Sequence, residues 1–306
     1  MTDSSAPTKA SIAAVFATMS RPETAVGCLC ALARQKIPPD LVVVAANDPS
    51  DGTQETLESF GVLPFKLKVH PMASNRGNAG GIEEAMEIAF QSGVDAVWIL
   101  DDDSWPQENA LKAIHESGFH PDVVKHAQQL DPTTHRLTWP LPFSAGDGKW
   151  KLAWEPKDLP NEPVCSTQAA WTGAVITRII YEKVGPVRGE LFIRGEDEEY
   201  PWRIAKSGFR FELVMDAIMD HPRPENLLHW SFLGKNLFYE KDLSAWKLHY
   251  KVRNMVWLKR KQAGVLKSLL MAMSYFAIAI AIDGPGRIPL LVRAISDGWF
   301  GKLGKL

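Results

Sequence analysis

The sequence predicts an α/β fold in which a mostly parallel sheet is flanked by helices. Short apolar segments alternate with amphipathic ones over the first hundred residues, the order that parallel strands and crossover helices produce. Polar clusters follow the apolar segments, as ligand-binding loops do in such sheets. The 306 residues are 45% hydrophobic with a net charge of -2, which allows a sizeable core and gives no overall attraction to nucleic acid.

Four strands and two helices account for this first part. The expected strands are residues 11–19 (SIAAVFATM), 41–47 (LVVVAAN), 65–70 (FKLKVH) and 96–102 (AVWILDD). Apolar residues at helical spacing mark one face of each intervening helix: Val26, Leu29, Cys30 and Ala33 on the first, and Ile82, Ala85, Met86, Ala89 and Phe90 on the second.

The loops after the four strands are expected to line one crevice, because the carboxyl ends of parallel strands share one edge of a sheet. They read TMSRPE, NDPSDGT, SNRGNAGG and DDDSWP. The glycines of the third loop allow an anion to approach a helix N-terminus, although a simple loop and cap explains them equally well. The ligand-binding candidates in the first three loops are Thr18, Arg21, Asn47, Asp48, Asn75, Arg76 and Gly77.

The fourth loop begins with three consecutive acids, Asp101, Asp102 and Asp103. Such a triple occurs by chance in solvated loops, but here it emerges from a buried strand at the ligand edge. Carboxylates at this spacing offer oxygens to Mg²⁺ or Mn²⁺, which keep open positions for phosphate oxygens. The loop therefore predicts a divalent metal and a metal-chelated diphosphate.

The later segments are less regular. Residues 121–163 are expected to form strands and loops over the crevice, and residues 171–185 a strand followed by a helix. Four acids, Glu196 to Glu199, precede or begin a helix over 198–206; they either favour the helix N-terminus or include a general base. A strand then ends at His221, which is either a structural donor or a metal ligand.

The expected organisation is a flexible tail over residues 1–10, an α/β domain over 11–223 and a helical region over 224–306. The domain comprises a nucleotide-binding half (about 11–120) and an acceptor half (about 121–223). The apolar run 268–282 is shorter than the roughly 20 residues that cross a bilayer, so it reads as a buried helix or as a helix lying on a membrane surface. Basic residues flank it: Lys251, Arg253, Lys259, Arg260, Lys261, Arg287, Arg293, Lys302 and Lys305.

The three cysteines fit neither a disulfide framework nor a zinc pattern, and the first ten residues lack the features of a secretory signal. Both observations predict a cytoplasmic protein. The basic, apolar C-terminal region leaves open peripheral contact with the cytoplasmic face of the inner membrane. The sequence does not indicate an oligomeric state.

The order of these motifs, from residue 12 to His221, resembles the family-2 inverting glycosyltransferases of the GT-A fold. The nearest resemblance is to galactofuranosyltransferases and their rhamnosyltransferase relatives, carried by DGT, NRGNAGG, DDDSWP, GAVITRIIYEKVG, FIRGEDEEYPWRIAKSGF and DAIMDHP. It implies that Asp101, Asp103 and His221 bind the metal and that Asp102 lies near the nucleotide ribose. It also implies that Asp197 is the catalytic base beside Glu196, and that Trp171, Thr172 and Gly173 lie near the acceptor.

The resemblance implies a single displacement with inversion of the anomeric carbon. The donor would be a UDP- or dTDP-linked sugar, with galactofuranose favoured over rhamnose, and the acceptor a cell-surface glycan or a polyprenyl-linked glycan. One departure concerns the nucleotide: Ala46 stands where relatives usually carry an aspartate that contacts the base, and Asp48 is a candidate replacement.

Two other functions remain open at this stage. A nucleotidyltransferase acting on sugar phosphates also places metal and nucleotide at the edge of an α/β sheet, but its basic, glycine-rich first loop is not matched by TMSRPETAVG. A non-catalytic carbohydrate-binding protein would use some of the eleven tryptophans for stacking on sugars, and it leaves the acid triple unexplained.

Overall fold

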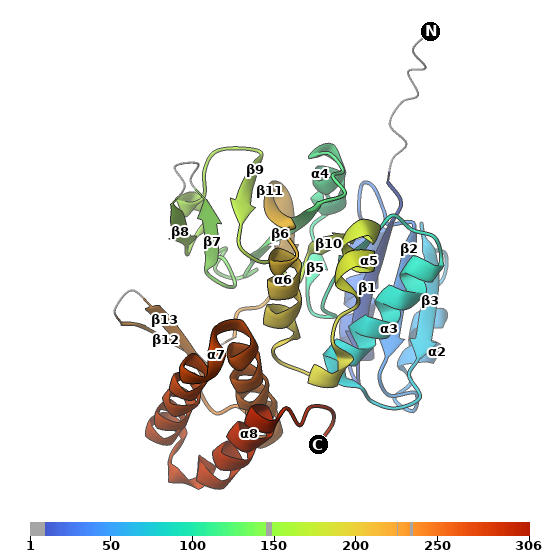
Figure 1. Cartoon of the computed structure of the whole chain (residues 1–306). Coiled ribbons are helices and arrows are strands. Elements are labelled where there is room, and N and C mark those ends of the chain that lie inside the picture. The colour runs from blue at the N-terminus through green and yellow to red at the C-terminus, as the bar shows by residue number, and fades with distance from the viewer. Residues whose placement is uncertain (1–9, 145–148, 225, 233–234) are drawn as a thin grey trace.

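The computed structural model describes residues 10–144, 149–224, 226–232 and 235–306. The flexible tail expected over residues 1–10 lies outside these residues except for its last position. Within the described residues the chain forms one large sheet, the helices that cover it, and a separate C-terminal helical region (Figure 1).

The large sheet has eleven strands in the order β3-β2-β1-β4-β10-β6-β11-β9-β7-β8, with β5 paired to β11. Four parallel strands form its first part: β1 (Ile12–Thr18), β2 (Leu41–Ala46), β3 (Lys66–Pro71) and β4 (Ala96–Ile99). Next to β4 lies β10 (Ala174–Thr177), which runs antiparallel both to β4 and to β6 (Val123–Leu130). The parallel pair β6 and β11 (Arg210–Asp220) follows, so the predicted α/β fold class is confirmed.

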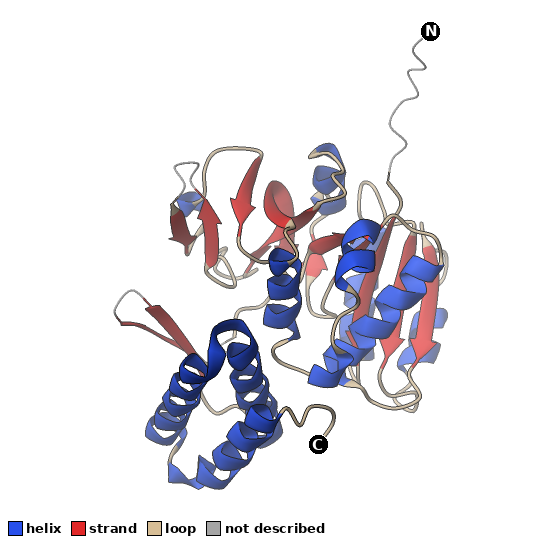
Figure 2. Ribbon diagram, in the orientation of Figure 1, coloured by secondary structure: helices blue, strands red, loops and turns tan. Residues whose placement is uncertain are grey.

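Helices cover both faces of the sheet (Figure 2). Side chains alternate along a strand, so Ile12 and Phe16 of β1 enter one buried cluster while Ala13 and Val15 enter the other. On the first side lie α1 (Pro22–Ala33), α2 (Thr53–Glu58) and α4 (Ala110–Glu116). On the second side lie α3 (Gly77–Gln91), α5 (Arg178–Val184) and α6 (Glu196–Lys206).

The predicted helix faces had different outcomes. All five residues expected on the inner face of α3 are buried. On α1 the expected face is confirmed in part: Leu29 is buried, and Val26 and Ala33 are partly buried and pack against the core. The other buried residues are Ala25, Cys28, Ala31 and Leu32, so the centre of the buried face lies about one position, or roughly 100°, from the expected one.

The region from residue 121 to 163 is more regular than expected. Strand β6 lies in the middle of the sheet, and β7 (Leu141–Ser144), β8 (Trp150–Ala153) and β9 (Val164–Thr167) extend it. The sequence of β6, VVKHAQQL, did not show a strand pattern, because several of its buried side chains are polar and are paired only in the folded sheet. Lys125 Nζ lies 2.6 Å from Glu212 Oε2, and His126 Nε2 lies 2.8 Å from Thr167 Oγ1. Three short 3₁₀ helices, η1 (Pro156–Asp158), η2 (Gly189–Leu191) and η3 (Pro285–Arg287), complete the connections.

The region after residue 224 is not wholly helical, which corrects the expectation. It begins with a hairpin of β12 (Leu227–Phe232) and β13 (Lys235–Glu240). Helix α7 (Ala245–Asp283) then bends sharply at Gly264 (φ 84°, ψ 179°), so that its second part folds back along its first part before α8 (Ile288–Phe300). These helices enclose a core of their own: Leu248, Val252, Val256, Ala272, Ala279, Leu291 and Ala294.

Helix α7 is longer than the apolar run identified in the sequence. By length and composition it is the one helix within the described residues that passes the criteria for a membrane span, with a most apolar window of mean hydropathy 2.0 that is 17% buried. The shortness of the run 268–282 therefore does not exclude a span. Length and composition alone do not distinguish a span from the helix of a soluble protein.

Candidate active site

The acid triple lies at the carboxyl end of β4, where the first and fourth loops meet. The Thr18 hydroxyl donates a hydrogen bond to Asp102 Oδ2 (2.8 Å), and Arg21 Nη2 lies 2.5 Å from Asp102 Oδ1. Arg21 Nη1 also donates to Asp103 Oδ2 over 3.3 Å. Burial raises the pKa of Asp102 to about 6, while Arg21 and Thr18 oppose that shift. The predicted residues Thr18, Arg21 and Asp102 thus form one connected group.

The pairing of β5 with β11 brings His221 to the same place. Strand β5 (Trp105–Pro106) directly follows the triple, and Asp220 at the end of β11 is the partner of Trp105. As a result, Asp101, Asp103 and His221 each offer a ligand atom within 4.8 Å of the others. Residues separated by more than a hundred positions in the sequence therefore meet as an oxygen and nitrogen ligand set.

The orientation of His221 leaves one ring nitrogen directed at the acids. Its Nδ1 lies 3.0 Å from the carbonyl oxygen of Pro222, which can only accept, so Nδ1 carries the hydrogen. In the neutral ring Nε2 is then a free acceptor, and it lies 3.9 Å from Asp101 Oδ2. This tautomer is the one in which Nε2 can bind a metal ion.

The segment from Trp171 to Gly173 lies behind the acids. The Thr172 hydroxyl donates a hydrogen bond to Asp101 Oδ2, and the Gly173 amide donates to the Ile99 carbonyl over 2.8 Å. Gly173 has a positive φ of 82°, and a Cβ there would lie 2.7 Å from the sulfur of Met219, so glycine is required. Trp171 is only 8% exposed and packs in the core, so its ring contacts protein and not solvent.

The second and third loops are held together by asparagines. Buried Asn47 donates from Nδ2 to the Gly77 carbonyl (3.2 Å) and accepts from the Arg76 amide (3.1 Å). Asn75 accepts from the Gly77 amide over 2.8 Å, and Asp48 accepts from the Ser50 amide over 2.9 Å. These side chains shape the loops at the sheet edge.

Arg76, one of the ligand-binding candidates, pairs with acids of the helix that it precedes. Its guanidinium forms ion pairs with Glu83 and Glu84 on its own helix, α3. Desolvation opposes ionisation of Arg76, but the two glutamates outweigh it and raise the pKa of Arg76 above its ordinary value. The structure therefore brings Arg21 to the acid group and leaves Arg76 in a separate ionic cluster.

The start of α6 presents two neighbouring acids with opposite exposure. Glu196 is 4% exposed and accepts a hydrogen bond from Asn78 Nδ2 (3.1 Å), while its Oε2 has no hydrogen-bond partner among the described residues. Burial and the adjacent charge of Asp197 raise the pKa of Glu196 to about 8. Asp197 is exposed and accepts from the Gly195 amide over 3.0 Å. Burial raises the pKa of Asp101, and the charges of Asp103 and, less strongly, Asp197 add to that rise.

Asn78 is a site residue that was not among the sequence candidates. It joins the start of α3 to the start of α6 through Glu196. The available signal was its place in NRGNAGG, directly after a glycine that lies at the sheet edge.

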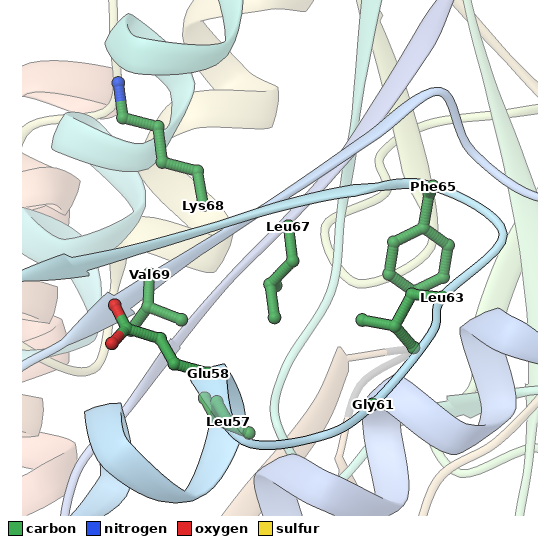
Figure 3. Close-up of a pocket in the computed structure, with 8 residues that line it drawn as sticks. All are labelled: Leu57, Glu58, Gly61, Leu63, Phe65, Leu67, Lys68 and Val69. Carbon is green, nitrogen blue, oxygen red and sulfur yellow. The ribbon is translucent and has the colours of Figure 1, made fainter.

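A separate pocket of about 420 Å³ lies at the outer edge of the sheet, between α2 and β3 (Figure 3). Most of its lining residues are apolar, Glu58 and Lys68 are the charged ones, and it contains none of the predicted site residues. It is three strands away from β4 in the sheet, so it is not part of the acid group.

The sheet with its acidic β4 edge, and the acids at the start of α6, have the arrangement expected for the GT-A fold. Residues 14–124 match the glycosyl transferase family 2 profile, and this match supports a glycosyltransferase. Among curated proteins it is similar to galactofuranosyltransferase GlfT1 of Mycobacterium tuberculosis, with 28% identity over 222 residues that cover 69% of this chain and 70% of the relative.

Solved structures agree on the fold. A mannosyltransferase, PcManGT from Pyrobaculum calidifontis, in complex with GDP-Man and Mn²⁺, superposes with a TM-score of 0.55 at 16% identity, covering 97% of this chain and 89% of that one. GalNAc-T7 with UDP, GalNAc and Mn²⁺ gives a TM-score of 0.53 at 13% identity over 87% of this chain and 55% of that one. At such identities the similarity shows the fold alone.

Proposed function

We propose that this glycosyltransferase transfers a sugar from a nucleotide-sugar donor to a hydroxyl group, with a divalent metal ion and with inversion. The observation that carries the proposal is the meeting of Asp101, Asp103 and His221 at one point of the sheet edge. The exposed carboxylate of Asp197 at the start of α6 adds support, because its charge contributes, after burial and Asp103, to the raised pKa of Asp101.

The ligand set suits Mn²⁺ or Mg²⁺. Two carboxylates and one imidazole are hard or intermediate donors, and the hydrogen on His221 Nδ1 leaves Nε2 available. Asp101 and Asp103 would hold the ion together with His221. When bound, the ion supplies positive charge to the diphosphate of the donor.

Within this site each protein group has a distinct task. Asp197 accepts the proton of the acceptor hydroxyl, whose oxygen forms the new bond to the anomeric carbon as the bond to the diphosphate oxygen breaks. The electron pair of the broken bond leaves on the nucleoside diphosphate, so no covalent enzyme intermediate is required. Thr18 and Arg21 hold Asp102 beside the donor, where its carboxylate is placed for the ribose.

The donor we propose is UDP- or dTDP-linked, with galactofuranose ahead of rhamnose. The support is the similarity to GlfT1, a galactofuranosyltransferase, over about two thirds of the chain. The acceptor we propose is a cell-surface glycan, including one carried on a polyprenyl lipid. Ala46 lacks the carboxylate of the usual base contact, and Asp48, the candidate replacement, accepts a hydrogen bond from the Ser50 amide.

The two alternative functions have less support. The glycosyl transferase family 2 match covers the loop that a nucleotidyltransferase would need to be basic and glycine-rich. A carbohydrate-binding role without catalysis leaves unexplained the exposed base candidate beside a metal ligand set.

We place the protein in the cytoplasm with its C-terminal helices in contact with the membrane surface. The second part of α7 exposes five large apolar side chains, each 46–70% exposed: Val265, Leu266, Leu269, Leu270 and Met273. The exposed Lys267 lies on the same part of α7 and the exposed Lys261 just before the bend at Gly264, and such basic residues favour anionic lipid. An apolar face with basic neighbours suits a helix that lies in the interface.

The test of the proposed reaction is transfer by purified protein from UDP-galactofuranose or dTDP-rhamnose, with and without Mn²⁺. We expect Asp197→Asn to lower kcat by about 10³-fold because the hydroxyl loses its proton acceptor. Glu198→Gln is the matched control, since it removes the next carboxylate of the same helix, and it should keep wild-type activity. Transfer that persists in Asp197→Asn, or after chelation of the metal, contradicts the assigned roles.

A further inference from the structure

The loop between η2 and α6 has an unfavourable backbone conformation. Phe192 and Arg194 have positive φ values of 67° and 68°, and Gly195 has φ 112°. Residues with side chains rarely adopt this left-handed conformation, because Cβ comes too close to the following carbonyl oxygen. Such a conformation persists only where surrounding contacts hold it. The loop, residues 191–195, directly precedes Glu196 and Asp197.

The contacts that hold the loop come from Asn254, in the first part of α7. Its side chain is fully buried, and Nδ2 lies 2.9 Å from the Leu191 carbonyl, 3.1 Å from Ile193 and 2.6 Å from Arg194. An amide group has two hydrogens, so both are used by carbonyls of this loop. The amide oxygen accepts from Arg253 Nε over 2.8 Å, which fixes the orientation of the group.

Arg253 supports the same loop and is itself 1% exposed. Its Nη2 donates to the Leu191 carbonyl over 3.1 Å, and its Nη1 donates to the Gly304 carbonyl over 2.6 Å. The guanidinium lies 4.6 Å from the ring centroid of Tyr250, which stacks on Phe192 at 4.8 Å. A buried guanidinium is stable only when its donors have hydrogen-bond partners. The ammonium group of a lysine could not make the same set of hydrogen bonds, so this arrangement is specific to arginine.

The loop also contacts the donor side of the site. The carbonyl oxygen of Phe192 accepts a hydrogen bond from the Ala79 amide in the first turn of α3 (3.0 Å), and Gly195 caps α6. Figure 1 shows this segment passing between α3 and the C-terminal helices on its way to α6. A shift of the loop would therefore move Asp197 relative to the groups that follow β4.

We infer that Asn254 and Arg253 are positioning residues for the transfer reaction, holding loop 191–195 so that Asp197 faces the donor. The C-terminal helical region is then part of the catalytic apparatus and not an appendage. The inference rests on the proposed function, because it takes Asp197 as the base.

The test compares Asn254→Asp with Ser268→Ala. The first variant keeps the side-chain shape but replaces the amide hydrogens with a carboxylate oxygen. The control removes another buried hydrogen bond of α7, from Ser268 Oγ to the Val256 carbonyl (2.7 Å), without touching the loop. For each variant we would measure kcat, the donor KM, the affinity for UDP with Mn²⁺, and hydrogen exchange of the amides of residues 191–199.

We expect Asn254→Asp to lower kcat on the order of 100-fold with UDP affinity changed less than about 3-fold, because a displaced base slows the chemical step. Its loop amides should exchange faster, while Ser268→Ala keeps wild-type kcat and loop protection. Arg253→Lys keeps the charge over Tyr250 and should show the same division between kcat and affinity, which provides a second variant if Asn254→Asp does not fold.

The inference is overturned if the Asn254 and Arg253 variants keep wild-type kcat, or if kcat and UDP affinity fall together as they would in any unstable protein. Failure of the proposed function has a different signature: the wild-type protein itself transfers no sugar. Hydrogen exchange does not depend on activity, so it reports whether Asn254 holds the loop in either case.

Discussion

At the scale of single residues, Glu196 and Asp197 are adjacent acids that differ in burial. Both Glu196 and Asp197 begin α6, yet the first is buried against Asn78 and the second faces solvent. A carboxyl whose pKa is raised to about 8 is mostly protonated at neutral pH, so Glu196 adds little negative charge at the start of α6. Of these two acids, the exposed Asp197 is therefore the one we propose as the base.

This difference leads to a pH prediction for Glu196→Gln. In the folded protein the pKa of Glu196 is about 8, whereas in the unfolded chain it is about 4.3. Between these values the folded state holds a proton that the unfolded state releases. The stabilisation is full below about pH 4 and is lost as pH rises through about 8.

A glutamine at this position does not titrate. As pH rises from 5 to 9 the wild type loses the stabilisation of the protonated Glu196, so the unfolding free energy of Glu196→Gln should rise relative to that of the wild type by an amount on the order of a few kcal/mol. Thermal unfolding without added metal at both pH values measures this gain. Glu108→Gln, at an exposed glutamate, is the control. An equal difference between variant and wild type at both pH values would rule out the buried, protonated state.

At the scale of elements, the entry to α3 depends on close backbone approach. Gly77 has φ 69°, and a Cβ there would lie 2.1 Å from the Phe192 carbonyl oxygen. We expect Gly77→Ala to lower the unfolding free energy by roughly 2–4 kcal/mol and to reduce transfer, because strain and a backbone clash add. Chemical denaturation of the purified variant measures the loss.

Gly52→Ala is a matched control for that variant. Gly52 has a similar φ of 74° at the start of α2, but no atom lies within 4 Å of the position of its Cβ. Only backbone strain applies, so the loss should be about 1 kcal/mol. Equal losses in the two variants would show that the contact with Phe192 does not restrict the site.

The sequence was sufficient to predict the elements whose residues follow a simple pattern. The four parallel strands, the face of α3 and the position of the acid triple all follow from apolar periodicity and strand ends. Strand β6 was missed because its polar side chains find partners only after β9 and β11 have assembled beside it. The hairpin β12–β13 was missed because its residues were grouped with the helices that follow it.

The candidate site could be predicted from the sequence less completely than the fold. The acid triple was predicted as a metal site from its place after a buried strand, whereas the joint ligand set of Asp101, Asp103 and His221 rested on the resemblance. Their meeting depends on the β5–β11 pairing, which no local pattern shows. Neither the ion pairs of Arg76 with Glu83 and Glu84 nor the burial of Trp171 was predicted from the sequence. The burial of Trp171 comes from tertiary packing, which residue spacing does not show.

At the scale of the whole molecule, the exposed apolar face of α7 predicts binding to anionic vesicles. We expect the protein to sediment with vesicles containing phosphatidylglycerol and less with phosphatidylcholine alone, with binding weakened by salt. The double variant Leu266→Asp and Leu270→Asp should bind at least about 10-fold more weakly, because two charges replace the most exposed leucines of the face.

The control for this experiment is Val62→Asp, which changes a fully exposed apolar residue in the α2–β3 connection, away from the C-terminal helices. It should bind vesicles as the wild type does. Equal binding by the double variant would show that the face of α7 does not contact lipid.

The position of β10 between β4 and β6 has a consequence for biosynthesis. The strands β3, β2, β1 and β4 emerge first from the ribosome, and until β10 arrives β4 is an edge strand with unpaired backbone groups. The two proposed halves on either side of residue 120 share this one sheet, so the first half waits for residues 174–177 before its inner edge is covered. A nascent chain stalled before that point exposes a flat, apolar edge, which makes it a natural substrate for chaperones.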